Sequence, residues 1–208
     1  MCALVGLLLL GGGVGCGASA RPLIEIDGFY SRAPAGWERI SPLTPPRMYQ
    51  FQLPRVDGDP ADAELVVFHY GRGYGGGDAT DALRWQREIE VPPDTPLADA
   101  SDIRTTEVSG VTVTIVDLRG VYRDRDADAA PSAAEGPDDG AEPAPVAGDG
   151  AGDGSAERVV RRPGYRLIGV TFASPHGPFF IRLVGPEATV RTHLPSFEAW
   201  LRGFSPPA

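Results

Sequence analysis

Lysine and asparagine are absent from this 208-residue chain, and cysteine occurs only twice. All 19 positive charges are therefore arginines, set against 28 acidic residues. Two cysteines are too few for a disulfide scaffold or a cysteine-rich metal cluster. Apart from a short apolar stretch at the extreme N-terminus, no hydrophobic run is long enough to span a bilayer. These absences exclude a disulfide-rich fold and an internal membrane span.

The negative charge is confined to one segment. Residues 124–157 contain ten acidic residues and one arginine, whereas the rest of the chain carries 18 of each sign. Binding to nucleic acid needs clustered positive charge that neutralises phosphates, and no such cluster exists in this sequence. We therefore expect no nucleic-acid partner. The acidic segment has almost no large apolar side chains, so we expect residues 124–157 to be a disordered insert.

The N-terminus has the pattern of an export signal. Residues 3–10 form a short apolar run, and Gly13, Val14 and Gly15 precede Cys16. Small residues directly before a cysteine resemble a bacterial lipobox, which predicts a signal peptide over 1–15 and acylation of Cys16. An ordinary signal peptide cut within 17–20, or a retained anchor, are the alternatives. Since Gly17 rather than aspartate follows the cysteine, the prediction favours the periplasmic side of the outer membrane.

The remaining chain predicts a lipidated tether over 16–25 and a single domain over 26–208. Alternation of apolar and polar residues predicts strands, and intervening turn residues pair these strands into hairpins. Ser109-Gly110 is typical of a two-residue turn, and Ser174-Pro175-His176-Gly177 fits a type I turn. The three predicted hairpins are 48–53 with 64–70, 103–108 with 111–122, and 165–173 with 179–184.

Two segments have the apolar spacing of helices. Residues 78–90 place Ala82, Trp85 and Ile89 on one face before Pro92-Pro93, and a final helix follows Gly185-Pro186. Pro195 predicts a kink or a helix in two pieces. In the strand 111–122 the apolar residues change faces after Ile115, which predicts a bulge or burial on both faces. The predicted fold class is α+β, an antiparallel sheet of successive hairpins covered by two amphipathic helices.

Several local patterns together resemble a known group of proteins. They are His69 to Gly76, Arg84-Trp85, Tyr165 to Gly169, and Gly185-Pro186 with Val190. These residues look like an uncharacterised family of exported bacterial proteins and lipoproteins, and the order of elements is similar to the PsbP/Mog1-like sandwich. The resemblance implies an accessory or binding role without catalysis, and it brings no catalytic residues or cofactor. Fold alone does not determine function.

The loop between the second strand and the first predicted helix is the most distinctive local motif. Gly71, Gly73 and Gly76 satisfy the spacing GxGxxG, which can bring backbone N–H groups against a phosphate. No parallel strand ending in an acid is predicted after it, so a flexible connection from strand to helix, or a mobile rim loop beside a cleft, is preferred to nucleotide binding. The predicted binding rim consists of Gly71, Arg72, Gly73, Tyr74, Gly75, Gly76 and Gly77.

The sequence also contains a partial calcium-binding pattern and three histidines. Asp124, Asp126, Asp128 and Glu135 occupy positions 1, 3, 5 and 12 of a calcium-loop pattern, although Ala129 stands where the loop wants glycine. The three histidines show no zinc or triad spacing, and a Ser–His–acid cluster could form only in space, from Ser174 or Ser196.

The predicted function is a lipid-anchored extracytoplasmic binding or assembly module that is not an enzyme and needs no cofactor. Its predicted partners are the membrane, through the anchor, and a protein or small ligand. A calcium-binding module or a cryptic hydrolase is the alternative.

Overall fold

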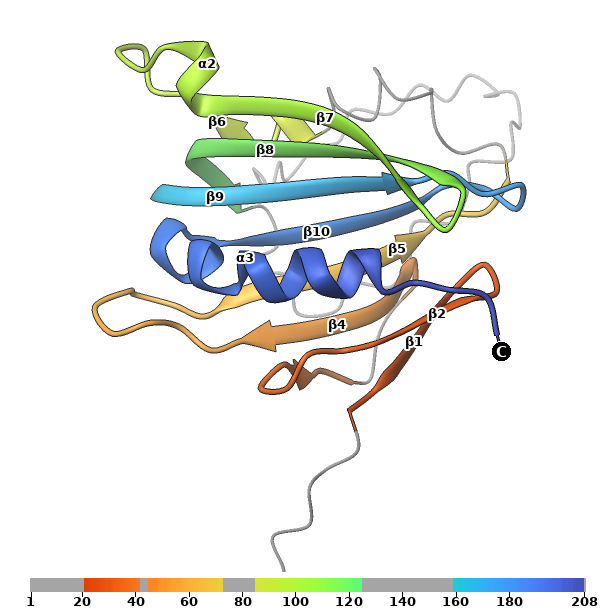
Figure 1. Ribbon diagram of the computed structural model, residues 1–208. Helices are drawn as coiled ribbons and strands as arrows, with labels where there is room; N and C mark the ends of the chain where they lie inside the picture. Colours follow the sequence, from red (N-terminus) through yellow and green to blue (C-terminus); the bar gives the residue numbers. More distant parts are fainter. Residues whose placement is uncertain (1–20, 42–44, 73–84, 125–158, 208) are drawn as a thin grey trace, which may run out of the picture.

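The computed structural model of the protein describes residues 21–41, 45–72, 85–124 and 159–207. Most of these residues form one antiparallel sheet of eight strands, beside a separate two-stranded ribbon (Figure 1). Neighbouring strands follow the order β3-β4-β5-β10-β9-β8-β6, and β7 also pairs with β8. The elements are β1 (Leu23–Ile26), β2 (Phe29–Arg32), β3 (Glu38–Arg39), β4 (Arg47–Leu53), β5 (Ala63–His69), β6 (Ile89–Glu90), α2 (Leu97–Ala100), β7 (Ser101–Val108), β8 (Val111–Asp124), β9 (Val160–Phe172), β10 (Phe179–Pro186) and α3 (Glu187–Arg202).

All three predicted hairpins are confirmed. β4 pairs with β5, β7 with β8, and β9 with β10, each in antiparallel register. Ser109 and Gly110, which join β7 to β8, both have positive φ, as a two-residue turn of this kind requires. In the connection from β9 to β10, the Gly177 N–H donates to the Ser174 carbonyl at 3.2 Å, which closes the predicted turn.

Strand β8 is buried on both faces. Every residue from Val113 to Leu118 is buried. Ile115 packs in the core on the α3 side, whereas Val116 and Leu118 belong to an apolar cluster on the opposite face. Of the two interpretations of the face change after Ile115, burial on both faces is therefore confirmed. The irregularity in this strand's pairing with β9 lies further along, between Gly120 and Tyr122.

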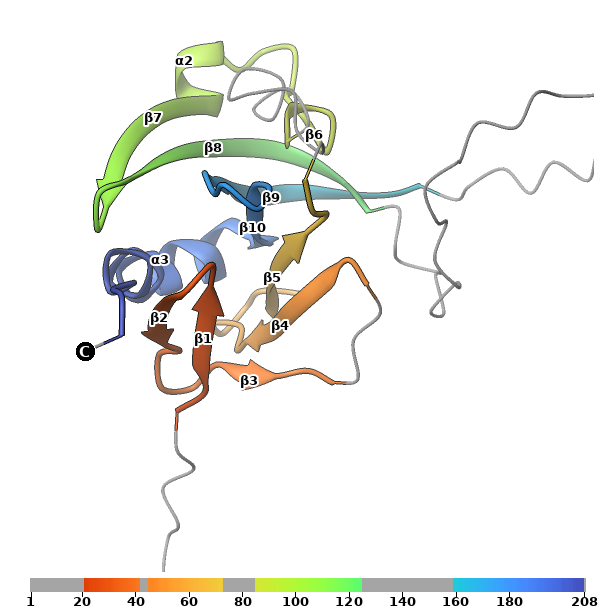
Figure 2. The same cartoon turned by 90° about the vertical axis from the view of Figure 1, so that its right-hand side faces the viewer.

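The C-terminal helix covers one face of the sheet together with the β1–β2 ribbon (Figures 1 and 2). α3 begins directly after Pro186, as predicted, and buries Val190, Phe197 and Leu201 in the core. Of the two alternatives predicted for Pro195, a helix in two pieces is wrong, because α3 is one helix that contains the proline, and the kink stays a prediction. Pro195 lies on the exposed side, where water can satisfy the backbone carbonyl that the ring leaves without a donor.

The second predicted helix is not confirmed. Its first residues, 78–84, lie outside the described ranges, and its last two, Ile89–Glu90, form β6 and pair with β8. Within those ranges α3 is the one helix longer than a single turn, so the expectation of two covering helices is wrong there. Trp85 and Gln86 are helical, but the helix ends there, and a turn at residues 87–88 leads into β6, so Trp85 and Ile89 are both buried without sharing one helix face. No helix in the described ranges is long and apolar enough to cross a membrane.

Two predicted boundaries also need correction. The tether was predicted to reach residue 25, but β1 begins at Leu23, and Ile24 and Ile26 are fully buried in the core on the α3 side. The domain therefore begins before residue 26, because the burial of Ile24 and Ile26 makes β1 part of it. The insert was predicted to begin at Asp124, which is instead the last residue of β8 and bonds Arg162. The rest of the predicted insert lies outside the described ranges.

Trp85 lies flat over a glycine in the centre of the sheet. A Cβ atom built on Gly169 would stand 2.5 Å from Cδ1 of the Trp85 ring, closer than atoms can approach. The ring is 2% exposed and packs edge-on to Phe180 at a centroid distance of 6.4 Å. Gly169 thus leaves the space that this indole fills, and Trp85 closes the centre of the face that α3 does not cover.

Replacing Gly169 by alanine therefore tests this contact. We expect Gly169→Ala to lower the free energy of unfolding by about 1–3 kcal/mol, because the added methyl group overpacks the site. Denaturation in urea measures the change. In a Trp85→Leu background the same substitution should cost clearly less. An equal cost in both backgrounds would contradict the assignment of Gly169 to the Trp85 contact.

Candidate functional site

The face of the sheet opposite α3 carries two neighbouring cavities, each of about 260 Å³. They share one lining residue, Arg182 of β10, so they form a groove that this arginine divides. We call this surface the open-face groove. One cavity is lined by Pro46, Arg47, Phe68, Tyr70, Trp85, Glu88, Phe180 and Arg182. The other is lined by Ala61, Asp62, Glu64, Tyr122, Asp124, Arg162, Tyr165, Arg182 and Val184.

Arg182 is held in the groove by two carboxylates. Its side chain is 8% exposed, because β10 lies between β5 and β9 near the middle of the sheet. One guanidinium nitrogen donates to Glu64 and the other to Glu88, both at 3.1 Å. A buried charge is costly unless it is paired and hydrogen-bonded, so these two acids are what make an arginine tolerable at this position.

A second arginine and an aromatic ring extend this cluster. The guanidinium carbon of Arg182 stands 5.6 Å from the centroid of the Phe68 ring, and that of Arg47 stands 5.8 Å from the same centroid. Arg47 also donates to Gln50 at 3.2 Å and to Glu64 at 3.5 Å. The groove therefore alternates cations, carboxylates and ring faces over a short distance, which is a surface for a ligand with both polar and apolar parts.

The other end of the groove is formed by tyrosines and one ion pair. Tyr122 and Tyr165 stack with ring centroids 5.9 Å apart and planes 8° from parallel. Burial raises the pKa of the Tyr122 phenol well above its ordinary value, so this group stays protonated at neutral pH. Arg162 donates to Asp124 at 2.8 Å, and this hydrogen bond raises the pKa of the arginine further. These groups can bind and orient a ligand as fixed charges and donors.

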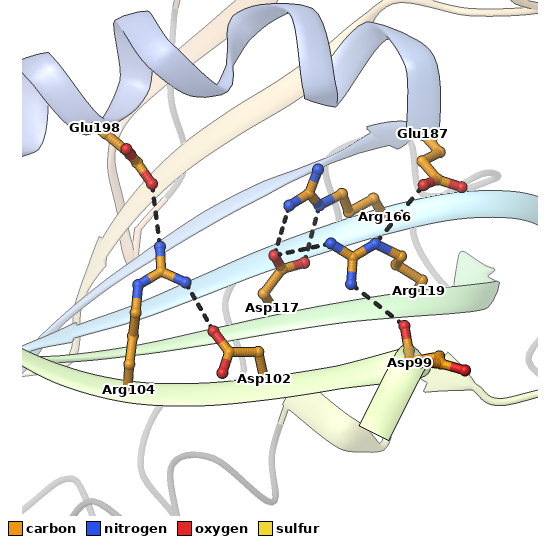
Figure 3. Close-up of polar contacts among 8 residues, drawn as sticks. All are labelled: Asp99, Asp102, Arg104, Asp117, Arg119, Arg166, Glu187 and Glu198. Atoms are coloured by element: carbon orange, nitrogen blue, oxygen red, sulfur yellow. Dashed lines mark hydrogen bonds and ion pairs between the residues drawn. The ribbon is translucent and has the colours of Figure 1, made fainter. Parts of the chain in front are cut away.

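A separate polar network joins α3 to the sheet on the covered face (Figure 3). Asp117 of β8 accepts two hydrogen bonds from Arg166 of β9, at 2.9 and 2.5 Å, and both side chains are less than one tenth exposed. Arg119 bonds Asp117 at 3.3 Å and reaches Glu187 in the first turn of α3 at 3.6 Å. This network fixes the start of the helix, and we assign it a structural role.

The predicted rim loop lies only partly within the described ranges. Gly71 and Arg72 are described, and Gly73 to Gly77 are not. A Cβ atom built on Gly177 would stand 2.1 Å from the Gly71 carbonyl oxygen, so the base of the loop rests on the turn between β9 and β10. Tyr70, the residue directly before the loop, lines the groove. The rim function of residues 71–77 stays a prediction.

The calcium pattern is not brought together in the described residues. Asp124 pairs with Arg162, whereas Asp126, Asp128 and Glu135 lie outside the described ranges. Across the ranges that can be assessed, no group of three histidine, cysteine or acidic side chains is placed to hold a metal ion.

A serine, a histidine and an acid do meet in space. Ser174 donates from its hydroxyl to Asp27 at 2.6 Å, and Nδ1 of His176 lies 2.6 Å from the other oxygen of the same carboxylate. In a catalytic triad the histidine stands between serine and acid to take the serine proton. Here both groups bond the carboxylate, so the cluster joins the β1–β2 turn to the β9–β10 turn. His69 and His193 contact backbone carbonyls of His176 and Pro54.

The charged residues of the open-face groove were missed by the sequence reasoning. Arg182 lies inside the apolar run FFIRLV, and a charge in a strand predicted to be buried was the available signal. Its partners Glu64 and Glu88 come from distant parts of the chain, and no local spacing connects them. The pairing of β5 with β10 brings Glu64 close to Arg182, and Glu88 reaches the same arginine from the turn before β6.

Comparison with known proteins shows structural likeness alone. No protein-family model matches the chain and no curated protein is similar to it in sequence. Solved structures similar to it include PsbP of the cyanobacterium Synechocystis, at 12% identity and a TM-score of 0.49 over 95% of this chain and 99% of that one. Another is PA94 of Pseudomonas aeruginosa, a protein of unknown function provisionally described as a regulator, at 11% identity and a TM-score of 0.42 over 91% and 99%. A PsbP protein is thus among the neighbours, and at these values the likeness carries no inference about function.

Breaking the Asp117–Arg166 pair from one side should be costly. We expect Asp117→Leu to lower the free energy of unfolding by about 3 kcal/mol, because it leaves a buried guanidinium without its carboxylate. The double variant Asp117→Leu with Arg166→Met should recover most of this loss, as measured by urea denaturation. Arg104→Met serves as the control. Arg104 pairs with Asp102 and Glu198, which are partly exposed, so this substitution should lower the free energy of unfolding by less than about 1 kcal/mol. A double variant no more stable than Asp117→Leu would contradict the assignment.

The Asp27 cluster should make stability depend on pH. The hydrogen bond from Ser174, and then the contact with His176, hold the pKa of Asp27 below its ordinary 3.8. Because this pKa is lowered in the folded state, the Asp27 carboxylate stabilises the protein fully above pH 3.8. Its contribution to the free energy of unfolding is lost as the pH falls below that value. Asp27→Asn should therefore destabilise the protein at neutral pH, by at most about 1 kcal/mol in this partly open site, and should have no effect in strong acid.

The measurement is the free energy of unfolding across the acid range. Asn tolerates the positive φ of residue 27, so the substitution removes the charge with little change in backbone. Asp57→Asn, at an exposed position, is the matched control and should show no such pH dependence. A difference between Asp27→Asn and the parent that is constant with pH would argue against this role of the carboxylate.

Proposed function

We propose that the protein is a lipid-anchored, extracytoplasmic binding module without catalytic activity, and that the open-face groove takes its ligand. The observation that carries the binding role is the meeting of two cavities of about 260 Å³ at Arg182, on the face that α3 leaves uncovered. Ligand sites are concave, have mostly apolar walls and hold a few convergent polar groups. In this groove the aromatic rings supply the walls, and the arginines and carboxylates supply the polar groups.

The anchor is supported by the sequence before the first strand. The apolar run 3–10 and the small residues before Cys16 have the pattern of a lipoprotein signal, and cleavage there would leave Cys16 as the first residue. Only six residues separate Cys16 from Leu23, where β1 begins. Since an extended residue spans at most about 3.6 Å, such a tether would hold the domain within roughly 25 Å of the membrane surface. Gly17 favours the outer membrane as its location.

The non-catalytic role is supported by how charge is arranged. In the groove each described arginine is matched with a carboxylate, and the described residues that line the two cavities include no serine, cysteine or histidine. Catalysis by a serine hydroxyl or a cysteine thiol needs such a group beside a base that accepts its proton, and the carboxylates of Glu64, Glu88 and Asp124 are held by arginines instead. The Asp27 cluster directs the Ser174 proton to a carboxylate instead. Binding is the activity that these residues can perform together.

The anchor is tested by metabolic labelling with a fatty-acid probe. The full chain should be labelled and should fractionate with membranes, whereas Cys16→Ser should lose the label and be released, because Cys16 is the residue that the lipobox pattern presents for acylation. Ser19→Ala, next to the predicted processing region, is the control and should be labelled like the parent. Label retained in Cys16→Ser would refute acylation at this position.

The groove is tested by site-specific photocrosslinking in cells. A photoreactive phenylalanine at position 70 places the reactive group at the edge of the groove, and the same residue at position 191 places it on the exposed side of α3. We expect adducts that form at position 70 and not at 191, and that decrease when Arg47→Gln is added. Equal adducts at both positions would mean that the open-face groove is not the binding surface.

A further inference from the structure

A third hollow lies on the other side of the molecule, where the chain enters the domain. It has a volume of about 440 Å³ and is bounded by the β1–β2 ribbon, the segment that follows it and the C-terminal half of α3. Neither cavity of the open-face groove shares a residue with it. Its lining residues are Arg21, Ser31, Arg32, Pro34, Ala35, Ser196, Ala199, Trp200 and Gly203.

The charge in this hollow has one sign. Arg21 and Arg32 are both exposed, and within the described ranges neither has a carboxylate at ion-pair distance. The polar contact of Arg32 given by the structure is a donation from one guanidinium nitrogen to the Arg21 carbonyl at 3.3 Å, which fixes the two residues side by side. The other lining residues are uncharged. The hollow is therefore a cationic site in a chain whose net charge is −9.

An exposed apolar side chain lies next to these arginines. Leu23 is 47% exposed and stands directly opposite Arg32 in the β1–β2 register, so the two side chains share one face of the ribbon. Leu23 is the first residue of β1, and Arg21 precedes it by two residues. A large apolar residue beside two unmatched cations is the combination that peripheral proteins present to an anionic lipid surface, where the apolar group enters the interface and the cations bind phosphates.

We propose that the surface of Arg21, Leu23 and Arg32 docks on anionic phospholipid, and that the two guanidinium groups bind a headgroup phosphate over the 440 Å³ hollow. Arginine suits this role because its planar fork of donors matches phosphate oxygens two at a time. The location rests on the proposed function, since an acylated Cys16 would lie five residues before Arg21. Docking through this surface would fix how the domain stands on the membrane and leave the opposite, open-face groove pointing away from it.

The test separates this contact from the lipid anchor by using the full chain with Cys16→Ser, which removes the predicted acylation site. Its co-sedimentation is measured with vesicles of phosphatidylcholine alone and of phosphatidylcholine with phosphatidylglycerol. We expect binding only with phosphatidylglycerol, falling steeply as salt is raised. In the same background, Arg21→Gln and Arg32→Gln should each weaken binding about fivefold, and Leu23→Ser should also weaken it.

The control is Arg55→Gln, which removes the same charge at an exposed position in the β4–β5 connection and should bind like the parent. Equal loss in Arg55→Gln would show that only net charge matters and would overturn the proposal. Unchanged binding in the Arg21→Gln/Arg32→Gln double variant would overturn it too. So would equal binding to both vesicle types, or full competition by soluble glycerol phosphate, which would indicate a free phosphate ligand. Loss of labelling at Cys16 is measured separately, so failure of the anchor and failure of this surface are distinguishable.

Discussion

Two arginines stand in strands that are buried on both faces, and the rest of the structure is arranged to neutralise them. Arg166 of β9 points to the face that α3 covers, and Arg182 of β10 points to the opposite face. Each lies directly across from a glycine of the neighbouring strand, Gly185 and Gly169 respectively. Since a lone buried charge costs several kcal/mol, each arginine must be matched by carboxylates.

The two arginines are neutralised in different ways, and this is why one face of the sheet is closed and the other holds a groove. Arg166 is matched by Asp117 on the adjacent strand, and the network continues to Glu187 of α3, so this face is closed by the helix (Figure 3). Arg182 is matched by Glu64 and Glu88, which leave space between them and the surrounding rings. One face therefore provides stability, and the other provides a groove on a rigid base, which is what a binding surface requires.

The sequence predicted those features that local patterns determine. Period-two alternation and turn residues predicted all three hairpins, and the apolar spacing after Gly185-Pro186 predicted α3, because each depends on residues close in the chain. The strand at Ile89–Glu90 was missed because it exists only through its pairing with Tyr122 and Val121 of β8. The groove was missed for the same reason: Arg182, Glu64 and Glu88 meet through long-range strand order, and no spacing in the sequence encodes that order.

The ends of the domain are clasped to each other. Tyr30 of β2 exchanges two backbone hydrogen bonds with Ser205, at 2.8 and 3.1 Å, and the Ala33 N–H donates to the Pro22 carbonyl at 2.9 Å. Mechanical load applied along the chain at Arg21 would therefore meet the open end of the β1–β2 ribbon and peel its bonds one at a time. The ribbon would therefore yield before the eight-stranded sheet, which is held by many more strand-to-strand hydrogen bonds.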